Sequence, residues 1–158
     1  MKKIALSFVL AASLFGIASA ENRTTPAPAA GSATTAEIQK MFGFVPDFFK
    51  NVPATLLPTW WAGLTQFQLN PATKLDGKTK ELIGLAVSAQ IPCEYCIYFH
   101  TEAARLNGAT EEEIHEAVGM AAITREGSTL LNGLQVDKAQ FKKDVSRIVA
   151  GARAAAKK

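Results

Sequence analysis

Apolar residues recur at helical spacing along most of the chain beyond residue 36, with short breaks at Gly and Pro. No run of alternating apolar and polar residues is long enough for a useful strand. The pattern therefore predicts an all-α domain over residues 37–158, built from several helices with short connections. The sequence shows no internal repeat.

Capping and turn residues set the boundaries of the expected helices. A short helical segment at 36–42 precedes a turn and a single helical turn within 43–53, and Asn70-Pro71 closes the next helix. Asp76 is the expected N-cap of a helix over 77–90. Pro92 is the expected first residue of a helix that Gly108 ends.

Two further helices follow. Thr110 and Glu113 form a capping-box pattern for a helix that reaches about residue 130. Asp137 caps a last amphipathic helix, whose apolar face carries Phe141, Val145 and Ile148.

Residues 1–20 have the pattern of a secretory signal peptide. Two lysines precede an apolar run, and Ala18-Ser19-Ala20 is a small-residue cleavage site. The run is shorter than the roughly 20 apolar residues of a membrane span, so we expect export to the periplasm without stable membrane association after cleavage. Residues 21–36, rich in Ala, Thr and Pro, are predicted to form a flexible leader.

The net charge argues against one class of partner. It is +3 for the whole chain and falls to +1 without residues 1–20, because these carry two lysines and no acid. Nucleic-acid binding requires a concentrated basic surface, which this balance does not supply. We therefore predict no nucleic-acid partner.

The chain has two cysteines, and they are separated by two residues in Cys93-Glu94-Tyr95-Cys96. A disulfide between them closes almost no loop, so it adds little to the stability of the fold. On a helix beginning at Pro92, Cys93, Cys96 and His100 lie within an arc of about 60°. The N–H groups of the first turn favour a thiolate, and His100 is placed to accept its proton. The spacing favours redox chemistry.

Glu81 supplies a candidate partner for His100. It begins an almost entirely apolar helical stretch, where a buried carboxylate needs a partner. Glu81 lies about nine residues before the turn at 90–91 and His100 about nine after it, so the two are level in an antiparallel hairpin. A contact between them would orient the imidazole, fix its tautomer and raise its basicity.

Glu81, Cys93, Cys96 and His100 together resemble the E-x11-C-x-x-C-x-x-x-H signature of the alkylhydroperoxidase D-like branch of the carboxymuconolactone decarboxylase family. The similarity extends over about residues 37–150. It implies a helical bundle with the CxxC pair at the N-terminus of a central helix, and association into trimers or larger rings.

The resemblance also implies a function. The pair would cycle between dithiol and disulfide while it reduces peroxides or a partner's disulfide, with electrons from a thiol donor and with no metal or organic cofactor. Cys96 would be the peroxide-reactive thiol and Cys93 the resolving thiol, with His100 and Glu81 as a proton relay. Tyr95 stands where some members carry a second histidine, which predicts a lower peroxidase rate.

Two other interpretations stay open. The family's other chemistry, decarboxylation or a related lactone transformation, does not depend on a CxxC pair. A zinc-binding or purely structural module could use the two cysteines with His100 and His115. However, His115 lies on a different expected helix, where we interpret it as a surface residue.

Overall fold

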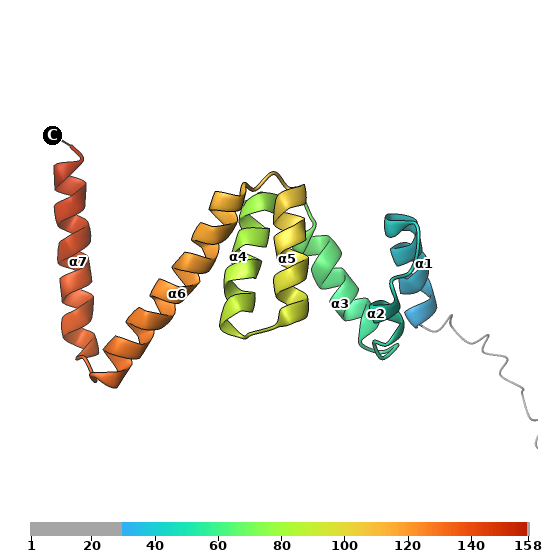
Figure 1. Cartoon of the computed structure of the whole chain (residues 1–158), viewed down its shortest axis with the longest axis horizontal. Helices are drawn as coiled ribbons and strands as arrows, with labels where there is room; N and C mark the ends of the chain where they lie inside the picture. Colours follow the sequence, from blue (N-terminus) through green and yellow to red (C-terminus); the bar gives the residue numbers. More distant parts are fainter. Residues whose placement is uncertain (1–29, 158) are drawn as a thin grey trace, which may run out of the picture. The chain divides into compact units, whose positions relative to one another are not determined.

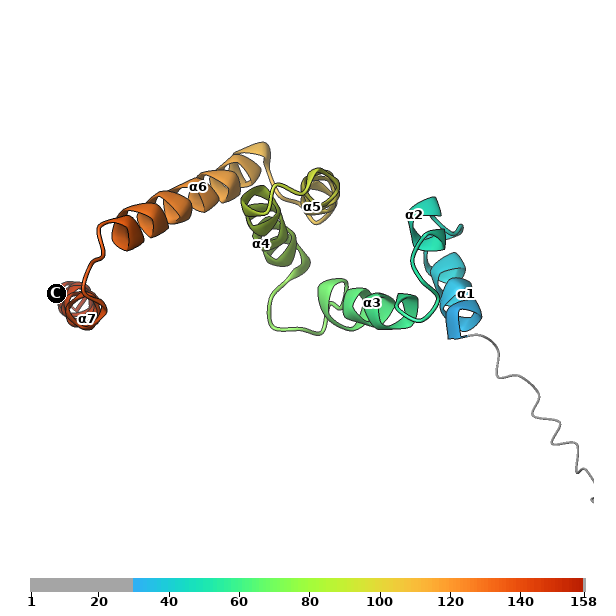
Figure 2. The same cartoon turned by 90° about the horizontal axis from the view of Figure 1, so that it is seen from below.

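The computed structural model of the chain describes residues 30–157, and every regular element in that range is a helix (Figures 1 and 2). The predicted all-α fold is therefore confirmed. The chain divides into two compact units, one up to Pro58 and one from Thr59, which are described separately. The signal peptide predicted at 1–20 lies outside the described residues, as does the predicted leader up to residue 29.

The first unit contains α1 (Ala30–Phe42) and α2 (Asp47–Lys50). Ile38, Phe49 and Leu57 are buried apolar side chains of this unit, and the ring of Phe49 stacks on that of Phe42 with centroids 6.4 Å apart. Residues 30–36 are helical, whereas the sequence predicted a flexible leader there. Thr34 is buried and lies one turn before Ile38, so the two share the buried face of α1.

The second unit contains the remaining helices. The segment α3 (Leu57–Gly63), which spans the boundary between the units, runs directly into a π-helical turn, η1 (Leu64–Gln68). The helices α4 (Gly77–Gln90), α5 (Glu94–Leu106), α6 (Glu111–Gly133) and α7 (Lys138–Ala155) follow. The predicted N-caps Asp76, Thr110 and Asp137 each accept a backbone N–H bond, and Gly108, with a φ of 83°, follows α5.

The helices α4 and α5 form the antiparallel hairpin that the sequence predicts, and α6 packs against α4 (Figures 1 and 2). Leu85, Ala104 and Ile114, one from each helix, form the buried apolar cluster among them. Lys78 donates to Glu113 over 2.7 Å and so ties α4 to the start of α6. This hydrogen bond holds the pKa of the Glu113 carboxyl below its usual value.

The start of α5 differs from the prediction. The helix begins at Glu94 rather than at Pro92, because Cys93 has extended backbone and acts as the N-cap. Its sulfur accepts the Cys96 N–H at 3.3 Å, and its own N–H donates to the Ser88 carbonyl at the end of α4. Cys93 therefore joins the two helices of the hairpin and lies just outside α5.

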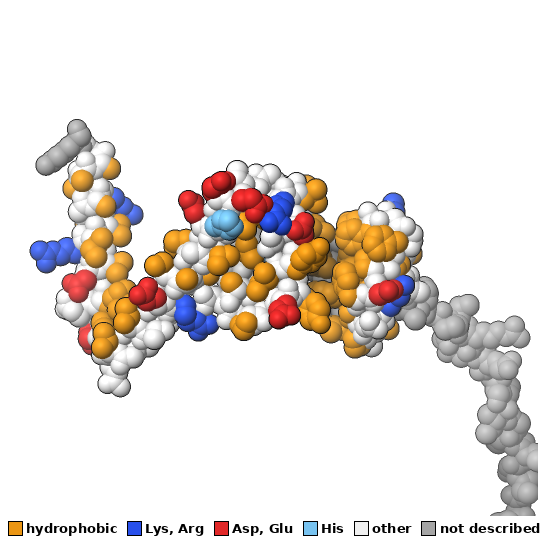
Figure 3. All heavy atoms as spheres, in the orientation of Figure 1, with side chains coloured by type: hydrophobic (Ala, Val, Ile, Leu, Met, Phe, Trp, Pro, Cys, Tyr) orange, Lys and Arg blue, Asp and Glu red, His pale blue; other side chains and the backbone are white. Residues whose placement is uncertain are grey.

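Large apolar side chains remain exposed along α6 and α7 (Figure 3). The predicted apolar face of α7 is among them, with Phe141 42%, Val145 40% and Ile148 70% exposed. Association of several copies of the chain, which the resemblance implies, stays a prediction. Among the described helices, none combines the length and the apolar character needed to cross a bilayer.

A glycine allows the close approach of α5 to α4. A Cβ atom added to Gly84 would overlap the imidazole ring of His100, with the ring Nδ1 only 2.5 Å away. A Cβ atom does not approach other heavy atoms this closely, so any larger residue must push the ring aside. The position of His100 therefore depends on the missing side chain at Gly84.

We predict that Gly84→Ala lowers the free energy of unfolding by about 1–3 kcal/mol, because the added methyl overpacks the α4–α5 contact. The measurement is urea denaturation followed by circular dichroism. Gly119→Ala is the matched control, since Gly119 lies inside α6 with open space around its added Cβ. This control should be neutral or stabilising by up to about 1 kcal/mol. Equal stability of the two variants would contradict the packing argument.

Candidate active site

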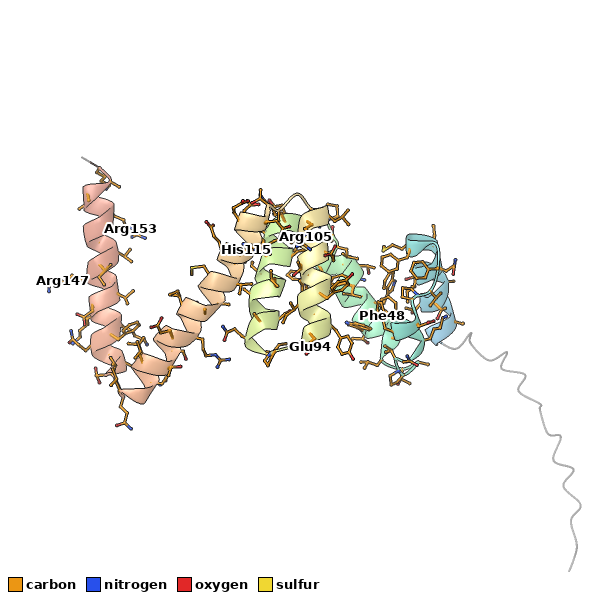
Figure 4. All side chains as sticks on the ribbon, in the orientation of Figure 1. Phe48, Glu94, Arg105, His115, Arg147 and Arg153 are labelled. Carbon is orange, nitrogen blue, oxygen red and sulfur yellow. A yellow bond between two sulfur atoms is a disulfide. The ribbon has the colours of Figure 1, made fainter. Side chains whose placement is uncertain are left out.

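Cys93 and Cys96 form a disulfide at the start of α5, with their Cα atoms 5.3 Å apart. Glu94, labelled in Figure 4, lies between them as the first residue of the helix. Both cysteines are half-buried. The free N–H groups and dipole at a helix N-terminus stabilise a negative sulfur. The local structure therefore favours thiolates when the disulfide is reduced.

His100 lies one turn after Cys96 on the same helix, with 19% of its side chain exposed. Its Nδ1 atom is 2.6 Å from Oε2 of Glu81, so the contact predicted by counting residues along the hairpin is present. A carboxylate only accepts hydrogen bonds, so Nδ1 carries the proton in the neutral imidazole. This leaves Nε2 as the basic nitrogen.

Glu81 is 1% exposed, so it is not a solvated acid of the first helical turn. Its oxygens also accept hydrogen bonds from Nε2 of Gln68, over 3.1 Å and 3.3 Å. Gln68 is the last residue of η1, and sequence reasoning did not single it out. The three side chains form a continuous row, Gln68–Glu81–His100, that draws on η1, α4 and α5.

Lys80 holds η1 and the loop after it against α4. It is 8% exposed, and its ammonium group donates to the carbonyls of Phe67 and Asn70 and to the hydroxyl of Thr73, over 2.7–3.0 Å. The residue next to Glu81 in the sequence thus fixes the backbone on both sides of Gln68.

A small cavity of about 120 Å³ adjoins this row. Polar side chains of Gln68, Asn70, Lys80, Glu81 and Asn107 contribute to its lining. It is roomy and polar enough for several water molecules. Glu81 therefore borders a polar cavity in addition to its contacts with His100 and Gln68.

His115 and Tyr95 both lie on the surface. His115 is exposed near the start of α6, as predicted (Figure 4). Tyr95 is 90% exposed, so its hydroxyl does not take the place of a second buried relay group. Within residues 30–157, no cluster of three or more His, Cys, Asp or Glu side chains is placed to hold a metal ion.

Curated relatives match the central part of the chain. The chain is 46% identical over 54 residues to uncharacterized protein 4 in the cox locus of Paracoccus denitrificans, which covers 34% of this chain and 49% of that protein. It is 39% identical over 60 residues to alkyl hydroperoxide reductase AhpD of Anaeromyxobacter sp. (strain K), and this match covers 38% of this chain and 31% of that protein. The matched stretches thus span about half and about a third of these relatives.

A solved structure supports the fold over a longer range. The crystal structure of the alkylhydroperoxidase AhpD core from Rhodospirillum rubrum is similar with a TM-score of 0.61 and 28% sequence identity. The match covers 71% of this chain and 86% of that one. The all-helical, AhpD-core-like fold expected from the sequence is therefore confirmed.

Residues 56–139 match the sequence profile of the carboxymuconolactone decarboxylase family. Because this match covers more than half of the chain and the fold agrees with that of a solved AhpD core, the chain belongs to the carboxymuconolactone decarboxylase family, with AhpD-like relatives.

Proposed function

We propose that the chain is a thiol-dependent oxidoreductase that reduces a peroxide, or a disulfide of a partner, through Cys93 and Cys96. One observation carries the proposal: the cysteine pair begins the helix on which His100 is bonded to a buried carboxylate. A reactive thiol needs a neighbouring base, and a base needs an orienting group. The AhpD relatives support the same chemistry.

In the first step, the Cys96 thiolate attacks one oxygen of the peroxide. The O–O bond breaks, Cys96 becomes a sulfenic acid, and the other oxygen leaves as an alkoxide. His100, having accepted the thiol proton at Nε2, returns it to the alkoxide, which departs as an alcohol. The negative charge of Glu81 stabilises the imidazolium formed in between.

In the second step, the Cys93 thiol attacks the Cys96 sulfur. The S–O bond breaks, water leaves with the Cys93 proton, and the disulfide forms. The two thiols have then passed two electrons to the peroxide. A partner's disulfide would react through the same sulfurs, with a mixed disulfide in place of the sulfenic acid.

A dithiol donor closes the cycle by exchange with the Cys93–Cys96 disulfide. As N-cap, Cys93 accepts the Cys96 N–H, which also stabilises a thiolate at this position and makes it a good leaving group. Export, predicted from residues 1–20, would expose the pair to an oxidising compartment. The donor would then have to be a dithiol protein of that compartment.

We predict that Cys96→Ser abolishes turnover of an organic hydroperoxide with a dithiol donor, because the attacking sulfur is gone. Cys93→Ser should react once and stop with a sulfenic acid on Cys96, which mass spectrometry detects as one added oxygen. Tyr95→Phe, an exposed change between the two cysteines, is the control and should keep wild-type turnover. Wild-type turnover of Cys96→Ser would rule out the thiol mechanism.

We predict that His100→Asn and Glu81→Gln lower turnover by about 100-fold and about tenfold, respectively. The first removes the base, and the second keeps the shape of the side chain but removes its charge. Steady-state rates across a range of pH test this, with His115→Asn, at an exposed site of α6, as the matched control. If His100→Asn and His115→Asn turned over equally well, His100 would have no role in proton transfer.

A further inference from the structure

We infer that Gln68 is a positioning residue, which fixes the Glu81 carboxylate and, through it, the tautomer of His100. The inference deepens the proposed function and rests on it for its effect on turnover. Its structural part rests only on contacts among η1, α4 and α5.

The hydrogen bonds of Glu81 identify the role of Gln68. The Gln68 amide nitrogen donates to both carboxylate oxygens, over 3.1 Å and 3.3 Å, while His100 approaches one of them at 2.6 Å. A carboxylate that is 1% exposed has lost almost all contact with bulk water. Such a group needs hydrogen-bond donors from the protein to remain charged. Of the two donors to Glu81, His100 and Gln68, only Gln68 cannot change its charge.

The chemistry of an amide suits this position. The Gln side chain does not titrate, so it donates at every pH at which the protein is folded. It can neither take the relayed proton nor compete with His100 for it. Gln68 thus restricts the rotation of the carboxylate without entering the proton transfer.

Gln68 is itself held in place by Lys80. The ammonium group of Lys80 binds the Phe67 carbonyl just before Gln68 and the Asn70 carbonyl two residues after it. The π-helical turn that ends at Gln68 widens the helix there. The backbone that carries the amide is therefore anchored to α4, the helix that carries Glu81.

The contact between Gln68 and Glu81 determines which ring nitrogen of His100 acts as the base. A fixed carboxylate keeps the His100 proton on Nδ1 and leaves Nε2 free to accept the thiol proton. Without the amide, the carboxylate can rotate away from Nδ1. The imidazole then populates the other tautomer as well, in which Nε2 carries the proton and is no base.

The test is ¹⁵N NMR of the histidine rings in the full-length protein at alkaline pH, without substrate. The chain has two histidines, so His115 provides an internal reference. In the wild type, His100 should be protonated at Nδ1, whereas Gln68→Met should give a mixture of tautomers and about tenfold lower turnover. Gln66→Met, at an exposed position of the same π-helical turn, is the matched control. It should keep the wild-type tautomer of His100 and the wild-type turnover.

A wild-type tautomer of His100 in folded Gln68→Met would overturn the inference. The unaltered protein gives an independent reading, because the bonded amide protons of Gln68 should exchange with solvent more slowly than those of exposed Gln66. Equal exchange would overturn it even if the variant failed to fold. Neither reading involves turnover, so wild-type activity of Cys96→Ser would refute the proposed function and leave the role of Gln68 standing.

Discussion

The buried carboxylate of Glu81 is the constraint on which the second unit depends. Removing a carboxylate from water costs several kcal/mol unless hydrogen bonds replace its hydration. The replacements come from His100 on α5 and Gln68 in η1. Three separate segments must therefore meet at one point. A hairpin shifted by even one residue would leave a buried charge without its partners, so the polar contact fixes the α4–α5 register more strictly than apolar packing alone.

The same contact links the fold to the chemistry. His100 and Cys96 lie on one continuous helix, so their spacing follows from helical geometry. The Glu81 contact then sets which ring nitrogen is basic, and Gly84 provides the room for the ring. Gln68 donates to the Glu81 carboxylate, and Lys80 binds the backbone next to Gln68. Apolar packing around Leu85 and Ile114 holds these polar groups together.

The sequence predicts the parts of this arrangement that regular helices determine. Caps such as Asp76 and Thr110 place helix starts to within a residue. The Glu81–His100 contact follows from counting, because α4 and α5 are uninterrupted on either side of their turn. Cys93 departs from its predicted place because an N-cap sulfur satisfies a helical N–H, which the position of Pro92 alone does not reveal.

Gln68 and Lys80 could not be predicted in the same way. Gln68 ends a π-helical turn, and an irregular loop separates it from α4, so helical counting from either side loses its phase. Lys80 also has the sequence signature of an ordinary surface residue near a helix start, although it is buried and donates three hydrogen bonds to η1 and to the loop after it. Likewise, residues 30–36 lack a periodic apolar pattern, yet Thr34 is buried within α1.

The proposed function requires Cys93 and Cys96 to act as a two-electron pair. The most direct test is to reduce the purified protein fully, add one equivalent of an organic hydroperoxide, and count free thiols while intact mass is recorded. For this role we predict loss of both thiols in each chain, a mass lower by two hydrogen atoms, and one equivalent of alcohol released. Thiols that persist, or oxygen added to a cysteine without disulfide formation, would contradict it.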